Sequence, residues 1–170
     1  MQAAKRARPL PVPFQLSMRI RHPSMDPAYI SKELQIEPEH SFLAGQPRRS
    51  QSGAASAAVH TESYWLAALE PAAWLDDTLL GIPEILAAVS EQRMNATLTK
   101  NLGWVLALFA ARCGKVHEAF LRRIRSEGGE VSLLVALTPD VVSSFNLSPE
   151  VSRIFGDLGI TLEFEITNDD

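Results

Sequence analysis

Basic residues that could hold an anion gather at two places in the first third of the chain. Arg21 and His22 close an alternating stretch, while His40, Arg48 and Arg49 flank a Gly-Gln-Pro turn. Arginine offers a planar fork of N–H donors that matches a carboxylate or a phosphate. If the strand end and the turn meet at one edge of a sheet, these five side chains form an anion site. The alternative, favoured because loops are polar by default, is a solvated basic rim.

Acid–base catalysis would require His40 or His60 to work with neighbouring glutamates in a pocket. Closeness in sequence supplies neither a pocket nor a hydrogen bond. The single cysteine, Cys113, falls on an apolar helical stripe, where we interpret it as a small buried hydrophobe. The chain contains no G-x-S-x-G, no phosphate-binding glycine loop and no H-E-x-x-H. We expect no catalytic residue and no cofactor.

Metal binding and nucleic-acid binding have weak support. Among the four histidines, only His117 has a cysteine at helical ligand spacing, and Cys113 is expected to face the core. The net charge of −4 gives no general attraction to nucleic acid. The expected open face of the sheet offers no aromatic for base stacking; it carries Arg19, Arg21, Ser132, Ala136, Glu163 and Glu165. We therefore expect neither a metal nor a nucleic-acid partner.

Length and composition predict one packed domain. The chain has 170 residues, of which 46% are hydrophobic, and residues 14–167 are long enough to bury a core. Residues 1–13 are basic and proline-rich, residues 168–170 form an acidic tail, and both are predicted to be tails. No apolar run approaches the roughly 18 residues that span a bilayer, and no signal peptide is recognisable. We expect a cytoplasmic protein without membrane contact.

Two strand–helix–strand units are predicted at the two ends of the domain. Residues 14–20 alternate as a half-buried strand, and Asp26-Pro27 begins a helix that ends near Gln35. Residues 46–58 are predicted to be a mobile loop, followed by a strand over residues 59–69. In the second unit, strands over residues 131–137 and 160–166 enclose a helix that begins after Ser148 and stops at Gly159.

The middle of the chain, residues 70–126, is predicted to be a helical insert between these units. Gly81, Pro83 and Gly114 divide it into three pieces, and Gly128-Gly129 ends it. Apolar residues recur there at steps of three and four and predict one buried stripe: Leu98, Leu102, Val105, Phe109, Cys113, Val116, Phe120 and Ile124.

Together the two units predict an α+β fold with a four-stranded, mostly antiparallel sheet and helices on one face. We expect a ferredoxin-like order, in which the first and last strands lie side by side. Arg19 and Arg21 would then form cross-strand pairs with Glu163 and Glu165 on the open face.

The order of segments resembles the bacterial domain of unknown function 4279 family. The matching pieces are "LSMRIRHPSMDPAYISKELQIEPEHSFLAGQPRR", "SYWLAAL", "GGEVSLLVAL" and "FNLSPEVSRIFGDLGITLEFEI", and they span most of residues 14–167. Residues 70–96 and 51–58 depart from the family pattern. The resemblance implies a compact α+β domain found singly in small bacterial proteins, with no established activity, cofactor or catalytic residue.

Association with another protein, or self-association, is the remaining interpretation. Apolar residues of the insert, among them Trp74, Leu79, Ile82 and Leu86, exceed what one small core needs to bury, although they could also pack on the insert's own helices. We therefore expect a non-catalytic interaction or binding module. The alternative is a small enzyme or anion-binding protein that uses Arg21, His22, His40, Arg48 and Arg49.

Overall fold

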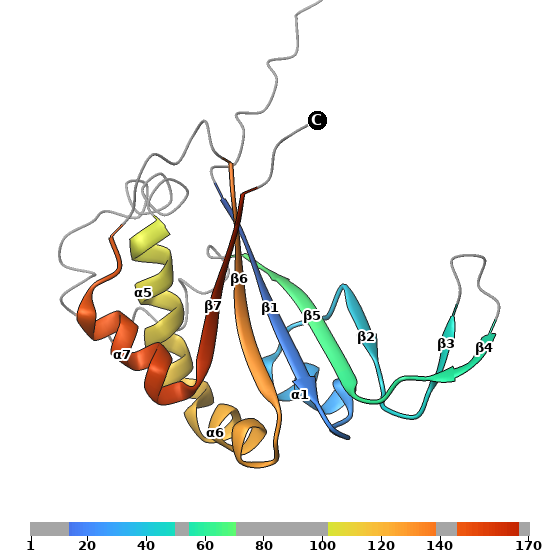
Figure 1. The fold of residues 1–170 in the computed structure, drawn as a ribbon. Helices are drawn as coiled ribbons and strands as arrows, with labels where there is room; N and C mark the ends of the chain where they lie inside the picture. The colour runs from blue at the N-terminus through green and yellow to red at the C-terminus, as the bar shows by residue number, and fades with distance from the viewer. Residues whose placement is uncertain (1–13, 50–54, 71–101, 139–145, 167–170) are drawn as a thin grey trace, which may run out of the picture.

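A five-stranded sheet forms the frame of the protein (Figure 1). The computed structural model describes residues 14–49, 55–70, 102–138 and 146–166. The strand order is β2-β5-β1-β6-β7, and every neighbouring pair is antiparallel except β6 with β7. The strands are β1 Phe14–His22, β2 His40–Phe42, β5 Ser63–Leu69, β6 Glu130–Leu137 and β7 Ile160–Ile166.

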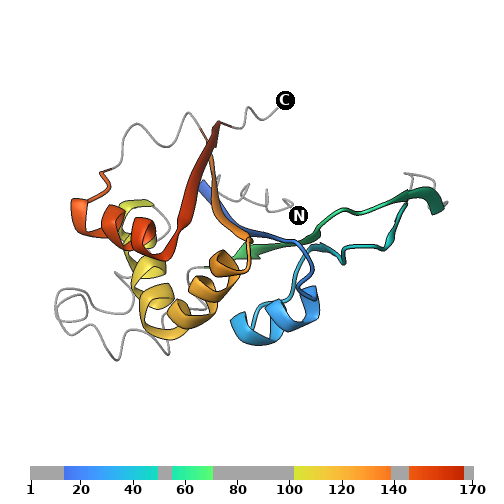
Figure 2. The same cartoon turned by 60° about the horizontal axis from the view of Figure 1, so that its bottom comes forward.

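The described helices cover one face of this sheet (Figure 2) and leave the opposite face, called here the open face, without a helical cover. They are α1 Pro27–Leu34, α5 Leu102–Arg112, α6 Glu118–Ser126 and α7 Pro149–Leu158. The general α+β prediction is confirmed. None of the described helices is long and apolar enough to cross a membrane.

Strand β1 shows why the sheet has a covered and an open face. Its side chains alternate, so Phe14, Leu16, Met18 and Ile20 are buried beneath the helices while the residues between them point to the open face. The same alternation buries Trp65 on β5 and Val131, Leu133 and Val135 on β6. These side chains join α1, α5, α6 and α7 in one hydrophobic core.

The capped helices α1 and α7 agree with their predictions. Asp26 accepts a hydrogen bond from the Ala28 N–H at 2.8 Å, and Gln35 ends α1 in the left-handed conformation with φ of 56°. At α7, Ser148 caps the first turn, and Gly159 ends the helix with φ of 69°. Both helices therefore begin after the predicted capping residues, Asp26 and Ser148, and end at the predicted positions, Gln35 and Gly159.

The apolar stripe through the helical region is corrected at one position. Residues Cys113–His117 form a π-helix that joins α5 to α6, so Gly114 does not interrupt the helix. A π turn contains one extra residue, and this shifts the following side chains around the helix. Val116, predicted to be buried, is 61% exposed, and His117 is buried in its place. Leu98 of the predicted stripe lies outside the described residues.

The ferredoxin-like order is wrong, because β1 and β7 are not neighbours. Strand β6 lies between them, antiparallel to β1 over Phe14↔Leu137 to Arg21↔Glu130 and parallel to β7. Most side chains of β6 are apolar or small, which suits a central strand. Strand β7 carries Glu163 and Glu165 on its open face, and charges of this kind are typical of edge strands.

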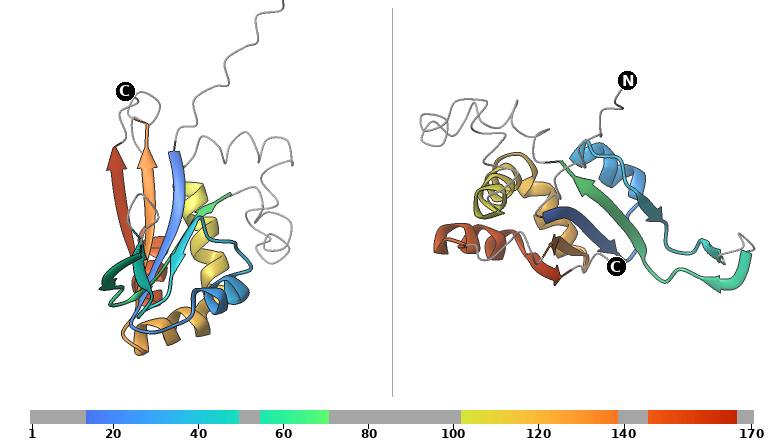
Figure 3. Two further views of the ribbon diagram at one scale, coloured as in Figure 1. Left: turned by 90° about the vertical axis from the view of Figure 1, so that its right-hand side faces the viewer. Right: turned by 90° about the horizontal axis from the view of Figure 1, so that it is seen from above.

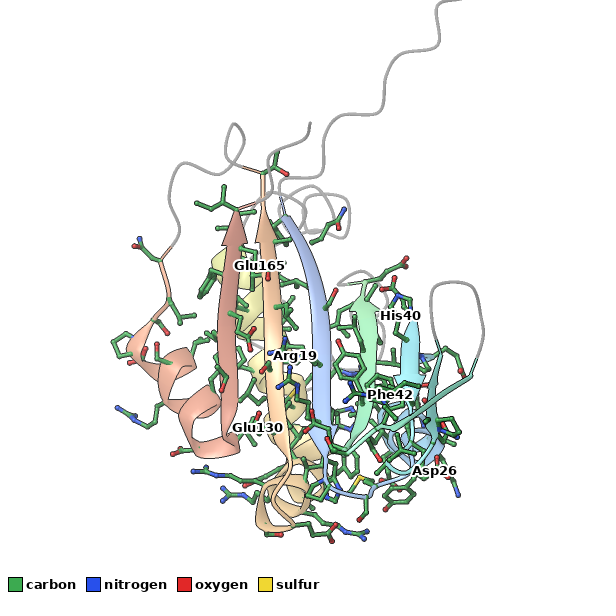
Figure 4. All side chains as sticks on the ribbon, turned by 45° about the vertical axis from the view of Figure 1, so that its right-hand side comes forward. Arg19, Asp26, His40, Phe42, Glu130 and Glu165 are labelled. Carbon is green, nitrogen blue, oxygen red and sulfur yellow. The ribbon has the colours of Figure 1, made fainter. Side chains whose placement is uncertain are left out.

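One predicted ion pair nevertheless forms across the intervening strand. Arg19 lies on β1 (Figure 4). Its side chain reaches over β6 to the Glu163 carboxylate and passes within 3.4 Å of the Ser132 hydroxyl. The small side chain of Ser132 leaves room for this crossing. Arg21 lies instead opposite Glu130 in register and 3.8 Å from Glu62.

The region predicted to be a mobile loop contains a hairpin arm. Strands β3 Pro47–Arg49 and β4 Ala55–Val59 pair antiparallel in a separate two-stranded sheet, while residues 50–54 lie outside the described residues. The arm extends beyond the β2 edge and bends toward the side of the open face (Figure 3). The predicted strand over residues 59–69 is therefore divided between β4 and β5.

Gly129 should not tolerate a larger side chain. A Cβ atom there would lie 2.6 Å from Ile124 Cγ2 and 2.8 Å from His22 Cδ2, both in packed surroundings. We expect Gly129→Ala to lower the free energy of unfolding by about 1–3 kcal/mol in urea denaturation. Gly156→Ala in α7 is the matched control, because its Cβ meets nothing within 4 Å; an equal loss in both variants would contradict this packing.

Burial of His117 predicts a pH dependence of stability. Burial lowers the pKa of His117, Arg112 lowers it further and Glu33 opposes them. The unfolded chain therefore takes up a proton below about pH 6.5 while the folded protein resists it, so stability is lost as the pH falls through this range. Unfolding free energies at neutral and mildly acidic pH should differ less in His117→Gln than in the wild type. An unchanged pH dependence would contradict the assignment.

Candidate functional site

A groove of about 840 Å³ lies between α1 and the edge strand β2. Helix α1 contributes Ala28, Ser31 and Lys32 to one wall, and β2 contributes Ser41 and Phe42 to the other. Strand β2 pairs with β5 along one edge, and no strand among the described residues pairs with its other edge. The groove therefore runs beside a sheet edge whose backbone can accept a further strand.

Packing beneath the groove fixes the distance between its walls. Ile30 and Leu34 of α1 are buried in the core, and the Trp65 indole N–H donates to the Ser31 hydroxyl at 3.0 Å. Because Trp65 belongs to β5, which also pairs with β2, this hydrogen bond ties both walls to the same strand. The α1 and β2 walls are thus held in place by the core, while Glu37, Pro38 and Leu43, which lie outside both elements, complete the lining.

Three rings stack on the open-face side of the same edge, and we call them the aromatic stack. The Phe42 ring lies 3.7 Å from His60 and 5.0 Å from Tyr64 between ring centroids, at interplanar angles of 18° and 11°. Two nearly parallel rings at these distances must occupy opposite faces of Phe42, because on one face they would overlap. Figure 4 places His40 and Phe42 on β2, at this edge.

Backbone hydrogen bonds hold the base of the arm next to the stack. The Gly45 N–H donates to the His60 carbonyl at 2.8 Å, and the His60 N–H donates to the Gln46 carbonyl at 2.9 Å. Gly45 has φ of 81°, a conformation that glycine adopts without strain. The turn that the sequence assigned to Gly45 therefore positions the His60 ring over Phe42.

A second, smaller pocket of about 330 Å³ surrounds His22 between the end of β1, α1 and α6. The His22 side chain is buried, and its Nδ1 accepts hydrogen bonds from the backbone N–H groups of Ser24 and Met25 at 3.1 and 2.8 Å. Glu127 and Arg123 lie at the mouth, joined by a hydrogen bond of 2.7 Å. This bond lowers the pKa of Glu127, and the charge of Arg123 lowers it further.

The structure does not bring the five predicted anion-binding residues together. Arg21 points to the open face, whereas His22, the next residue of β1, points to the covered face. His40 is exposed on the open face at β2, and Arg48 is exposed on the arm. Arg49 belongs to β3, but its side chain lies outside the described part of the structure.

The predicted interface residues Trp74, Leu79, Ile82 and Leu86 all fall within 71–101, outside the described residues. Cys113 is buried, and burial raises the pKa of its thiol to about 12, in agreement with an inert side chain. In the described part of the chain, no three His, Cys, Asp or Glu residues gather in a group that could hold a metal ion.

Two features were not predicted from the sequence, the aromatic residues of the open face and the His22 pocket. The open face was expected to lack aromatics, but Phe42 and Tyr64 lie on it, because β2 adds an unpredicted strand and Tyr64 alternates with the buried Trp65. The period-two pattern of residues 63–69 could have placed Tyr64. The grouping of His22 with Tyr29, Arg123 and Glu127 depends on tertiary packing, and no local pattern signals it.

No family model matches the chain, and no match was found among curated proteins or solved structures. The resemblance to the domain of unknown function 4279 family stays a prediction.

A double-mutant cycle tests the aromatic stack. Phe42→Leu and Tyr64→Leu each remove a ring while keeping an aliphatic side chain. We expect a coupling of about 0.5–1.5 kcal/mol between them in urea unfolding, because the pair is stacked. Strictly additive losses would show that the two rings do not interact in solution.

Proposed function

We propose that this protein is a non-catalytic interaction module that takes up an extended segment of a partner protein as an added strand beside β2. The observation that carries the proposal is the groove between α1 and the edge of β2. An edge strand supplies backbone hydrogen bonds for affinity, and a neighbouring helix supplies a wall that distinguishes side chains.

Alternation in the added strand gives its side chains two different environments. One set would point into the groove, where Asp26 and Glu37 carry negative charge and Lys32 carries positive charge. The other set would point to the open face, beside His40 and Phe42. The segment that fits these surroundings best alternates two kinds of residue. One kind is polar and can pair with the negative and positive charges of the groove, and the other can contact an aromatic ring.

The chemistry of the groove supports binding more than catalysis. Its lining includes amides, hydroxyls, one lysine and two carboxylates, but neither a histidine nor a cysteine. Asp26 is already engaged in capping α1, so its carboxylate is held as a structural acceptor. Groups of this kind orient a ligand through hydrogen bonds.

Anion binding and self-association, both predicted from the sequence, remain two further proposals. The predicted anion site used Arg21, His22, His40, Arg48 and Arg49, and it would have to work without His22, which points to the covered face. It is favoured by the half-exposed Arg21, whose contact with Glu62 is long at 3.8 Å. Self-association through Trp74, Leu79, Ile82 and Leu86 stays a prediction, as does a cytoplasmic location.

Selection from a displayed library of random peptides tests strand addition at the groove. Ala28→Trp fills the groove from the exposed side of α1, whereas Ala119→Trp places the same side chain on the exposed surface of α6. Selected peptides should bind the wild type and Ala119→Trp equally, and bind Ala28→Trp at least about tenfold more weakly, or ~1.4 kcal/mol. Cooperative unfolding of both variants serves as the folding control.

Methylated peptides distinguish a strand from any other bound shape. N-methylation of alternate residues removes either the N–H groups that face β2 or those that face away from it, so one series should lose binding and the other should keep it. Equal binding to Ala28→Trp and Ala119→Trp, or equal loss in both methylated series, would refute the proposed mode.

A further inference from the structure

The His22 pocket contains a buried hydrogen-bond donor without an acceptor. His22 is 3% exposed, and its Nε2 forms no hydrogen bond with any described residue. Because Nδ1 already accepts from Ser24 and Met25, the proton of the neutral ring must be on Nε2. A buried N–H that is left unpaired costs free energy, and such groups in folded proteins call for an explanation.

Glu127 places a carboxylate directly in front of this donor. Its Oε2 lies 3.4 Å from His22 Nε2, while its Oε1 accepts from Arg123 Nε at 2.7 Å. The Glu127 side chain follows the end of α6 and is 40% exposed, so it can rotate into solvent without disturbing the core. The carboxylate therefore lies between two donors from an exposed position and is hydrogen-bonded to only one of them, Arg123.

Other donors converge on the same point. Arg123 Nη1 donates to the Tyr29 hydroxyl oxygen at 3.3 Å, which leaves the hydroxyl proton of Tyr29 available to a further acceptor. The guanidinium lies 5.5 Å from the Tyr29 ring centroid, and this cation–π contact helps to hold its fork in place. Asp26 also lines the pocket, but its Oδ1 is engaged by the Ala28 N–H.

We infer that the His22 pocket binds the carboxylate group of a small ligand, and that Glu127 is the internal occupant that this ligand displaces. Arg123 supplies a planar fork that matches a carboxylate, and His22 Nε2–H and the Tyr29 hydroxyl supply the other donors. The pocket volume of about 330 Å³ is at the lower end of small-molecule sites. The inference is independent of the peptide groove, which lies on the other side of α1.

Acetate is the probe that tests the carboxylate site, with chloride at matched ionic strength as the reference. NMR would follow the His22 imidazole nitrogens and the Met25 amide, which donates to His22 Nδ1. Glu127→Gln removes the competing charge, so acetate should bind this variant about tenfold more tightly than the wild type. Shifts should saturate, and chloride should not reproduce them.

Two arginines on α6 provide a matched pair of variants. Arg123→Gln should abolish the acetate response in the Glu127→Gln background, and Arg123→Lys should weaken it because a lysine lacks the fork. Arg122→Gln is the control, since Arg122 forms the same kind of pair with Glu118 outside the pocket. An acetate response that does not saturate in Glu127→Gln, or that is as strong with Arg123→Gln as with Arg122→Gln in that background, would overturn the inference.

Discussion

Strand β1 is paired along both of its edges, and its apolar side chains all lie on one face. These two properties determine where the helices lie, because a central strand with one apolar face needs helices on that face alone. The described helices, α1, α5, α6 and α7, pack over that face. The sheet ends at β2 on one side and at β7 on the other. Both candidate sites border α1, the helix that follows β1 directly: the groove on its β2 side and the His22 pocket on its α6 side.

Local signals in the sequence predicted the elements better than their arrangement. Asp26-Pro27 and Ser148-Pro149 act within a single turn, so α1 and α7 could be placed almost to the residue. The position of β6 between β1 and β7 depends on which strands pair along both edges, and alternation within one strand does not report that. The π-helix at Cys113–His117 likewise shifts a side-chain register that an ideal helical period cannot anticipate.

The candidate site residues show the same division between local and tertiary information. Gly45 was predicted as a turn residue, and its positive φ agrees. The basic residues Arg21 and His22 were grouped because they are adjacent in sequence, yet adjacency in a strand sends them to opposite faces. No local pattern groups Arg123 and Glu127 with His22, because their approach to His22 depends on the packing of α6 against the end of β1.

Amide hydrogen exchange of β2 is the most direct test of whether the β2 edge accepts an added strand. Exchange would be followed by NMR in the wild-type protein, alone and saturated with a peptide selected on it. Strand addition should slow exchange within His40–Phe42 and change little along β7, which is the opposite edge of the same sheet. Protection that appears at β7 with none at β2, or binding that leaves the exchange of β2 unchanged, would contradict it.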